Sequence, residues 1–365
     1  MNVLVSFTPL EAYTFGTDQT YNYETGSGEN VRKTGKESYL ATSNLIPEQT
    51  TLLGTLRYMV LLKKGLLRSD FQYDNESRAR IADCIGRTSF RFTDMPQQFG
   101  KIHAISPLFL MNTADNDILV RNPLNNRSEN TGYKPMVLGR TVRTSYGMIS
   151  LPDDSQYNAK NGYASGHISL INLKIYHDLF FSEFATGNRK SKDENQSDKG
   201  YYRRELIRLK NGFSFCILAD IDEGALPEQC IVYMGLKKAA FRATVQDLSR
   251  SSLFSPSDTL SSPSDILRKK AESALHSDIP CYYALSDCVM NDAFQFSAFS
   301  IVEQKSIRNI ATDLSAKKAV SKLSRTSYRT NLVSAGSVFY AYPAALADQH
   351  VGNIIGYNTI CNLGG

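Results

Sequence analysis

The sequence predicts an α+β protein of two domains, and three observations predict this class. Residues 2–7 alternate apolar and polar side chains in the manner of a β-strand. After a polar, glycine-rich loop over residues 18–37, residues 44–65 carry apolar side chains at helical spacing. A strand, a long loop and an amphipathic helix, in this order, begin a ferredoxin-like (RNA-recognition-type) domain. The chain of 365 residues is long for one hydrophobic core, so two domains are expected.

Residues 44–65 form the clearest predicted helix. Pro47 suits its first turn, and Gly65 can take the left-handed conformation that ends a helix. Gly54 lies mid-helix, where glycine costs about 1 kcal/mol relative to alanine, so we expect another backbone, of protein or nucleic acid, to pass close to it. The residue pattern alone favours a helix packed on a sheet. Its polar edge nevertheless has side chains that can hold a phosphodiester chain: Gln49, Thr50, Thr51 and Arg57.

Further along the chain, the pattern predicts short strands separated by turns, together with further helical segments. One helix is expected from Ser264 to about Leu275. Residues 305–329 contain seven basic residues against Asp313 alone, and are interpreted as a basic helical stretch. Strands are expected at residues 88–93, 101–105, 109–111, 212–219, 231–234, 282–289, 294–303 and 332–342, the last broken at 335–337.

Residues 112–165 differ from their surroundings because they are polar, turn-rich and weakly patterned. Between Arg121 and Arg143 there are five basic residues and one acidic residue, Glu129. A stretch this long inside a compact domain is usually functional or disordered, so we interpret it as a protruding hairpin or lobe that carries positive charge. The predicted domains are residues 1–183, carrying this insertion, and residues 184–365. The polar segment 185–200 is the expected boundary or mobile loop.

Composition limits the possible functions. The formal net charge of +5 and the pI near 8.7 are below what a dedicated DNA-binding domain shows, so any nucleic-acid role must come from local clusters. The six cysteines form no C-x-x-C pair, which is typical of reduced thiols in a cytosolic protein. The first residues do not resemble a signal peptide, and no window has the roughly 18 apolar residues of a membrane helix. We therefore expect a soluble, cytoplasmic protein without a membrane partner.

Signatures of catalysis are missing from the sequence. There is no phosphate-binding G-x-x-x-x-G-K-[ST] loop and no H-E-x-x-H zinc motif. The five histidines are scattered singly, and the clustered aspartates lie among turn residues, where aspartate is favoured for its backbone hydrogen bonds. We therefore expect no catalytic residue, no metal site and no cofactor.

Signatures of RNA binding are better represented. The tail after Gly352 is rich in glycine, which lets a backbone approach phosphates closely. Two basic stretches, residues 121–143 and 305–329, have tyrosines near them, and charge with interleaved aromatic rings suits single-stranded RNA. Each basic stretch alone is better explained as a solvated face, but together they favour RNA.

Several short stretches of the sequence resemble a known protein family. Ser38 and Tyr39, followed by IPEQTTLLGTLR at residues 46–57, resemble the first helix of RAMP-superfamily subunits of type III-B (Cmr) CRISPR effector complexes, in particular the subunit that holds the 5′ end of the guide RNA. Short matches follow in the same order over nearly the whole chain: Pro9 with residues 15–17 (FGT), 99–100 (FG), 105–110 (ISPLFL), 201–203 (YYR), 212–215 (GFSF), 234–235 (MG), 335–337 (AGS) and 355–358 (IGYN).

The resemblance implies a fold and a role in antiviral defence. The fold would have two ferredoxin-like domains, a basic β-hairpin thumb in the N-terminal half and a C-terminal glycine-rich loop. The chain would be a non-catalytic subunit that grips the repeat-derived 5′ tag of the crRNA and caps that end of the ribonucleoprotein. Its neighbours would be the large cyclase-type subunit and the adjacent backbone RAMP subunit, with target RNA passing near the tag, where the thumb would interrupt pairing.

The resemblance also carries RNA contacts onto positions of this chain. The residues of the expected thumb are assigned from their charge more than from a motif. The matches at Lys190, Tyr202 and Arg203 are the least specific. The candidate RNA-binding residues are Phe15, Gly16, Thr17, Gln49, Thr50, Thr51, Arg57, Arg121, Arg127, Lys134, Arg140, Arg143, Lys190, Tyr202, Arg203, Gly352, Gly356, Tyr357 and Asn358.

Two alternatives stay open at the level of sequence. One is a metal-independent endoribonuclease of the same superfamily that processes CRISPR repeat RNA. Such an enzyme needs a histidine or tyrosine base beside the bound strand, and the helix at 44–65 carries no histidine. The other alternative is a protein scaffold whose basic stretches pair with acidic subunits.

Overall fold

The computed structural model describes most of the chain, and in these residues strands predominate. The described residues are 1–17, 40–68, 73–93, 97–145, 147–153, 164–189, 200–236, 238–251, 253–255, 258, 260–289, 297–311, 324–325, 329–340 and 353–364. Their α-helices are α1 (Gln49–Lys63), α2 (Asn75–Ile85) and α3 (Pro263–Ala274). The predicted α+β class is therefore confirmed, whereas two ferredoxin-like domains stay a prediction.

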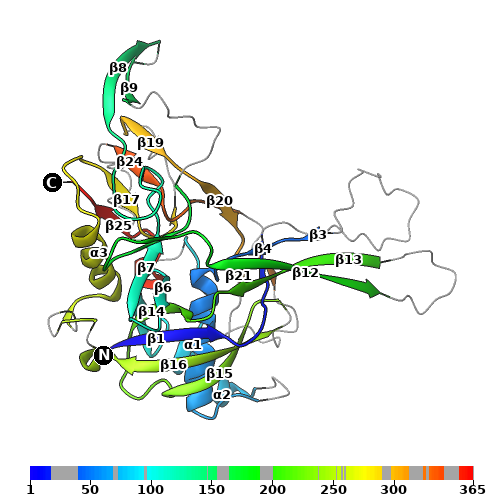
Figure 1. The fold of residues 1–365 in the computed structure, drawn as a ribbon. Helices are drawn as coiled ribbons and strands as arrows, with labels where there is room; N and C mark the ends of the chain where they lie inside the picture. The colour runs from blue at the N-terminus through cyan, green and yellow to red at the C-terminus, as the bar shows by residue number, and fades with distance from the viewer. Residues whose placement is uncertain are drawn as a thin grey trace.

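A large antiparallel sheet forms the centre of the molecule (Figure 1). It takes strands from both sides of residue 183, where the sequence predicted a boundary, and that division of the chain stays a prediction. The strand order is β11 (Ile175–Tyr176), β10 (His167–Ser169), β7 (Asp117–Arg121), β6 (Phe109–Asn112), β14 (Phe213–Ile221), β1 (Asn2–Pro9), β16 (Ala239–Asp247) and β15 (Gln229–Met234), with β5 (Ile102–Ile105) also paired to β14.

Strand β14 shows how this sheet builds two cores. Successive side chains of a strand point to opposite faces. Phe215 and Ile217 enter the core that contains the apolar side chains of α1. Cys216 and Leu218 enter the core that contains those of α3. Because both faces are covered here, β14 is an almost continuous apolar run, as the sequence predicted for residues 212–219.

Helix α1 confirms the clearest sequence prediction, with two differences. The helix begins at Gln49 after the N-cap Glu48, so Pro47 precedes the helix instead of lying in its first turn. Gly65 takes a φ of +64° just after the helix, as expected. Gly54, however, is exposed, and a Cβ added there meets no described atom within 4 Å. Within the described part of the chain, the expectation that another protein backbone passes close to Gly54 is therefore wrong, whereas the approach of a nucleic-acid backbone stays a prediction.

Helix α2 was not predicted, although its sequence carries a start signal. Asp74 accepts a hydrogen bond from the amide of Ser77 at 2.7 Å and so caps the helix, which buries Ile81 and Cys84. Ile85 packs partly against the same core, and so few apolar positions give no visible periodicity. The strand expected at residues 88–93 is not formed.

The C-terminal part of the chain forms α3 and two smaller sheets. Helix α3 begins after Ser262, whose hydroxyl accepts from the amide of Asp265, close to where the sequence predicted a helix. One sheet has the order β19 (Phe299–Ile301), β24 (Val338–Tyr340), β17 (Tyr282–Ala284), β25 (Ile360–Asn362), and the other β18 (Cys288–Val289), β23 (Thr330–Val333), β20 (Gln304–Ile307).

The basic stretch 305–329 is not helical where it is described. Strand β20 pairs with β23, and β21 (Ile310–Ala311) pairs with β22 (Ser324–Arg325). Pairing with a strand distant in sequence replaces the local helical preference, which is a weak determinant. Residues 312–323 and 326–328 lie outside the described residues.

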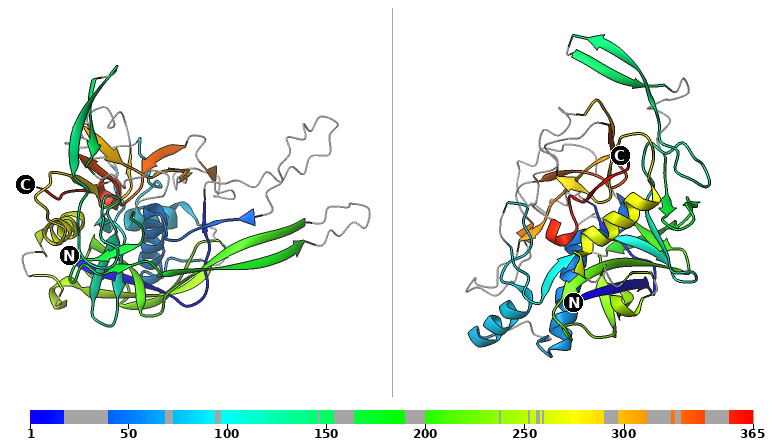
Figure 2. Two further views of the ribbon diagram at one scale, coloured as in Figure 1. Left: turned by 45° about the horizontal axis from the view of Figure 1, so that its top comes forward. Right: turned by 90° about the vertical axis from the view of Figure 1, so that its left-hand side faces the viewer.

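Two hairpins project from this body (Figures 1 and 2). Strands β8 (Leu138–Thr144) and β9 (Gly147–Pro152) form one of them, inside the segment 112–165. Strands β12 (Phe180–Arg189) and β13 (Gly200–Leu209) form the other, and β3 (Leu40–Ala41) runs parallel to β13. The prediction of a loop at 185–200 is wrong at both ends, where residues 185–189 and Gly200 belong to strands; residues 190–199 lie outside the described residues.

The described residues contain neither a membrane-spanning helix nor a metal-binding group of side chains. No helix there is long and apolar enough to cross a membrane. No group of three or more histidine, cysteine, aspartate or glutamate side chains in the same residues is arranged to hold a metal ion.

Candidate nucleic-acid interface

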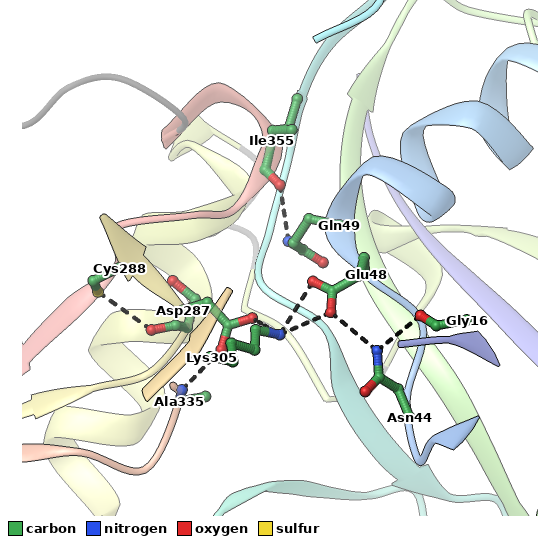
Figure 3. Close-up of polar contacts among 10 residues, drawn as sticks. Gly16, Asn44, Glu48, Gln49, Asp287, Cys288, Lys305, Ala335 and Ile355 are labelled. Atoms are coloured by element: carbon green, nitrogen blue, oxygen red, sulfur yellow. Dashed lines mark hydrogen bonds and ion pairs between the residues drawn. The ribbon is translucent and has the colours of Figure 1, made fainter. Parts of the chain in front are cut away.

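Three motifs that are far apart in sequence meet at the start of α1, at a place we call the α1 corner. Strand β4 (Ser43–Asn44) pairs with β2 (Phe15–Gly16). The Asn44 Nδ2 donates to the Gly16 carbonyl at 3.2 Å and to Glu48 Oε1 at 3.5 Å (Figure 3). The first loop is therefore attached directly to the first turn of α1.

The C-terminal loop docks on the same turn through Gln49. This side chain is 5% exposed, and its Nε2 donates to the Ser106 carbonyl at 2.8 Å. The same Nε2 donates to the Ile355 carbonyl, also at 2.8 Å (Figure 3). Gly356 follows with a φ of +82°, and an added Cβ would lie 2.0 Å from Gln49 Nε2. The predicted RNA ligands Gln49 and Gly356 thus hold the tail against the helix.

The two residues after Gly356 are also engaged within the protein. Tyr357 is fully buried, and its ring lies 5.9 Å from that of Phe90 in a stacked arrangement. Asn358 is 8% exposed, and its Oδ1 accepts a hydrogen bond from the Val289 amide at 2.7 Å. Neither side chain is presented to solvent, so an RNA contact at these positions would require the loop to rearrange.

A half-buried ionic cluster joins the α1 corner to the C-terminal sheets. The Lys305 ammonium lies 2.9 Å from Glu48 Oε1 and 2.5 Å from Asp287 Oδ2 (Figure 3). Burial raises the pKa of Glu48, and the Lys305 charge opposes that shift. Burial alone would lower the pKa of Lys305, but Asp287 and Glu48 outweigh burial and hold it above its usual value. Lys305 is therefore occupied by protein carboxylates and is not available to phosphates.

Phe15 is buried and Arg57 is half-buried, unlike the expectation for RNA ligands. The Phe15 side chain is 4% exposed, and its ring centroid lies 4.8 Å from that of Tyr13. The Arg57 guanidinium donates from Nη2 to the Thr88 carbonyl at 2.7 Å and lies 5.0 Å from the centre of the Phe99 ring. Burial lowers the pKa of Arg57 to about 10, so it stays charged at neutral pH. Both side chains hold the fold in this structure.

We expect Arg57→Ala to lower stability rather than to weaken RNA binding specifically. The substitution removes the packing on Phe99 and the hydrogen bond to Thr88, which together contribute about 1–2 kcal/mol. Urea denaturation followed by circular dichroism measures this loss. An unchanged unfolding midpoint would show that Arg57 is not structural.

The accessible part of the α1 corner is made of small residues beside the second hairpin. Gly16 is exposed, and Thr17, Thr50 and Thr51 are partly exposed. The hairpin β12–β13 contacts the α1 corner through Glu205 of β13. Thr14 Oγ1 donates to the Glu205 carbonyl at 2.8 Å, and the Ser43 amide donates to Glu205 Oε2 at 2.9 Å. Small residues at an exposed corner are suited to a close approach by a phosphodiester chain.

The hairpin β12–β13 presents a cation stacked on an aromatic ring. Arg203 is exposed, and its guanidinium lies 4.0 Å from the centre of the Phe184 ring, which is 47% exposed. An aromatic ring with an arginine beside it is a surface on which a base can stack. Phe184 was missed by sequence reasoning, because only the register of the hairpin brings it next to Arg203.

Arg121 borders a pocket of about 200 Å³ beside the α1 corner. Leu45 and Ile46, which precede α1, line the same pocket. The Arg121 Nη2 lies 3.7 Å from Glu303 Oε2, and 28% of its side chain is exposed. His167 also lines the pocket, where burial lowers its pKa to about 3 and keeps the ring neutral. Arg121 is thus partly neutralised.

The remaining basic residues of segment 121–143 follow the first hairpin. Arg127 and Lys134 are both exposed and lie side by side, because the Arg127 amide donates to the Lys134 carbonyl at 2.9 Å. Arg140 and Arg143 are exposed on β8, three residues apart, so they point to opposite faces of the hairpin. Met148, opposite Arg143, is 63% exposed at the turn. This hairpin combines positive charge with an apolar tip, and the apolar tip was not foreseen.

Three of the candidate residues cannot be placed fully. Gly352 and Lys190 lie outside the described residues. The backbone of Tyr202 belongs to β13, whereas its side chain lies outside the description.

Comparisons with known proteins give distant structural likenesses only. No protein-family model matches the chain, and no curated protein matches it. The chain is similar to chains of two cryo-EM structures of the type III-B Cmr-β complex bound to cognate target RNA, the first also with AMPPnP. The first match has 12% identity and a TM-score of 0.48, and covers 100% of this chain and 98% of that chain. The second has 13% identity and a TM-score of 0.47, and covers 100% of this chain and 97% of that chain.

A third likeness is weaker. It is to a chain in a crystal structure of the Csm3–Csm4 subcomplex of the type III-A CRISPR–Cas interference complex, with 11% identity, a TM-score of 0.32, and coverage of 93% of this chain and 92% of that one. These TM-scores are too low to assign a fold or a function.

Proposed function

We propose that this chain is a non-catalytic, RNA-binding subunit of a type III CRISPR effector that grips the 5′ tag of the guide RNA. The short motifs of the chain, which resemble RAMP-superfamily subunits of type III-B complexes, support the CRISPR part of the proposal. The large cyclase-type subunit and a backbone RAMP subunit are the partners that this role requires.

The observation that carries the proposal is the α1 corner. Residues 15–17, 49–51 and 355–358 are the segments to which the resemblance assigns RNA contact, and they adjoin one another at the first turn of α1. Their side chains are mostly used to hold the corner together. The RNA contacts are therefore assigned to the exposed Gly16, the partly exposed threonines and the nearby hairpin β12–β13 with Arg203.

The two hairpins supply the charge that the corner lacks. Arg203 on β12–β13 and Arg140 with Arg143 on β8–β9 are exposed cations on projecting elements. Single-stranded RNA is held by charge along its backbone and by stacking of its bases on aromatic rings. The hairpins therefore extend the grip beyond the corner, with β8–β9 in the role of the thumb.

Charge reversal on the hairpins tests the proposal. We expect Arg203→Glu and the double variant Arg140→Glu with Arg143→Glu each to weaken binding of a 5′-tagged guide RNA by about tenfold or more. Each should also reduce the dependence of log affinity on log salt by roughly 0.7 for every phosphate that the protein no longer neutralises. Fluorescence anisotropy over a series of salt concentrations measures both effects.

The matched control is Lys269→Glu, an exposed charge reversal on α3. It should change the affinity for the tagged RNA much less than the hairpin variants. If all three variants weaken binding equally, the effect is one of net charge, and the assignment of the hairpins is wrong. If the wild-type chain does not prefer tagged over untagged RNA, the tag-binding function is wrong.

One cluster of three surface side chains supports a second candidate function. His103 Nε2 lies 2.8 Å from Asp222 Oδ1, and Lys101 Nζ lies 2.9 Å from Asp222 Oδ2. A carboxylate that orients a histidine, with a lysine beside it, is an arrangement that a metal-independent endoribonuclease uses for acid–base chemistry. Against this function, Asp220 and Glu223 lie next to the group in sequence and add negative charge that repels RNA.

Incubation of the pure protein with repeat RNA in EDTA separates the two functions. We expect no specific cleavage, and the same result for His103→Ala. Specific cleavage by the wild-type protein that His103→Ala abolishes would favour the endoribonuclease and overturn the non-catalytic role.

A further inference from the structure

The outer face of β15 and β16 is an open part of the central sheet. In both strands the side chains alternate between buried and exposed. Val232 and Met234 point into the core that contains the apolar side chains of α1. Ile231 and Tyr233 point the other way and are 42% and 56% exposed. No described strand pairs with the far edge of β15, so this face adjoins a free edge.

The strand register groups the exposed side chains of this face into rows. One row joins Thr8, Arg242 and Ile231 across β1, β16 and β15. The next row joins Leu10, whose amide donates to the Ala240 carbonyl at 3.0 Å, with Ala240 and Tyr233. Leu10 is 51% exposed. Leu10, Ile231, Tyr233 and Arg242 thus form one contiguous surface, which we call the β15–β16 patch.

The chemistry of the β15–β16 patch fits a protein better than RNA. It has a tyrosine, two aliphatic side chains and an arginine, and tyrosine and arginine are the residues that most often dominate protein interfaces. It carries one cation, whereas RNA binding needs several. The exposed Glu11, whose Oε1 accepts from the Ala240 amide at 2.8 Å, lies at its border and reduces the positive charge further.

Arg242 indicates the charge of the partner. Its side chain is exposed, and no salt bridge or hydrogen bond joins the guanidinium to any residue in the described part of the chain. An arginine set among apolar side chains gains most from a carboxylate that arrives with an apolar surface around it.

We propose that the β15–β16 patch docks another protein subunit of the same ribonucleoprotein, through an apolar surface that carries an aspartate or glutamate opposite Arg242. The inference rests on the proposed function in one respect, that the chain works inside a complex with other protein subunits. The patch lies on the opposite side of the body from the hairpin β8–β9 (Figure 1). The protein contact and the thumb therefore use different faces.

Photocrosslinking inside the assembled complex tests the docking face. A photoreactive phenylalanine analogue is placed at position 233 of the chain, which is co-expressed with the subunits encoded beside it and with guide RNA. The control site is position 171, where Ile171 is 63% exposed on the turn between β10 and β11. We expect a crosslink from position 233 to another protein subunit, at a peptide that contains a carboxylate, and a much weaker crosslink from position 171.

Other results of the crosslinking overturn the inference. A crosslink from position 233 to RNA would make the patch an RNA platform, and a crosslink to a second copy of the chain would make it a dimer contact. Crosslinking no stronger than at position 171 would show that nothing docks there.

The variant Arg242→Glu provides an independent measurement. We expect the amount of partner subunit that co-purifies per chain to fall by about tenfold, whereas the affinity of the isolated chain for tagged RNA stays within about twofold. Unchanged co-purification would overturn the docking face. If instead the wild-type chain fails to bind RNA while position 233 still crosslinks to a protein subunit, the proposed RNA function fails and the docking face stands.

Discussion

Replacing Gly356 by alanine is expected to lower the free energy of unfolding by about 3 kcal/mol or more and to release the C-terminal loop from α1. Gly356 has a φ of +82°, which costs an alanine about 1–2 kcal/mol. The new methyl group would also lie 2.0 Å from Gln49 Nε2 and 2.4 Å from the Ser106 carbonyl oxygen. These atoms are held by hydrogen bonds on both sides, so the clash cannot be relieved without breaking the contact between Gln49 and Ile355.

Urea denaturation by circular dichroism measures the loss, and limited proteolysis reports the release of the loop. The matched control is Gly65→Ala. Gly65 has a similar φ of +64°, but a Cβ there meets no described atom within 4 Å. This control should cost only about 1 kcal/mol. Equal losses in the two variants would mean that backbone conformation alone, and not the packing on Gln49, constrains Gly356.

The parts of the fold that could be predicted are those with a strong local pattern. Helix α1 and helix α3 have apolar faces at helical spacing, α1 is followed by Gly65 and α3 is preceded by the N-cap Ser262. Strand β14 is an apolar run between turns. Helix α2 was not predicted, because Ile81 and Cys84 are its only fully buried residues. The order of strands in the central sheet joins residues far apart in the chain, and no local pattern specifies it.

The candidate site shows a different limit of sequence reasoning. The resemblance assigned RNA contact to several residues that lie at the α1 corner, but the sequence did not indicate what these residues contact. Gln49 and Arg57 are polar, so a surface that faces RNA is the expected place for them. In the structure Gln49 is buried and Arg57 is half-buried, because carbonyl groups reach them from Ser106 and Ile355, which lie 57 and 306 residues away from Gln49, and from Thr88. Burial of a polar side chain depends on such distant partners.

Removing the charge of Lys305 is expected to cause the other large decrease in the free energy of unfolding. In Lys305→Met the carboxylates of Glu48 and Asp287 would lie together with no cation between them, and these side chains are 17% and 16% exposed. Breaking a fully buried pair costs about 3–5 kcal/mol. Because the Lys305 side chain retains 28% exposure, we expect about 2–3 kcal/mol at neutral pH.

This loss should depend on pH in a definite direction. Burial already raises the pKa of Glu48, and without Lys305 the lowering influence on it disappears. A carboxyl group whose folded-state pKa is raised takes up a proton more readily when folded, so stability is regained as the pH falls through that pKa. The deficit of Lys305→Met relative to the wild type should therefore shrink as the pH falls from neutral into the acidic range.

Thermal and urea unfolding of both proteins across this range measures the deficit. Glu48→Gln added to Lys305→Met removes one of the two unpaired charges and should recover part of the stability at neutral pH without a change in side-chain size. A deficit that is the same at every pH, or that Glu48→Gln does not reduce, would mean that Lys305 stabilises the junction through the packing of its aliphatic chain. In that case the ionic cluster would not be what joins the α1 corner to the C-terminal sheets.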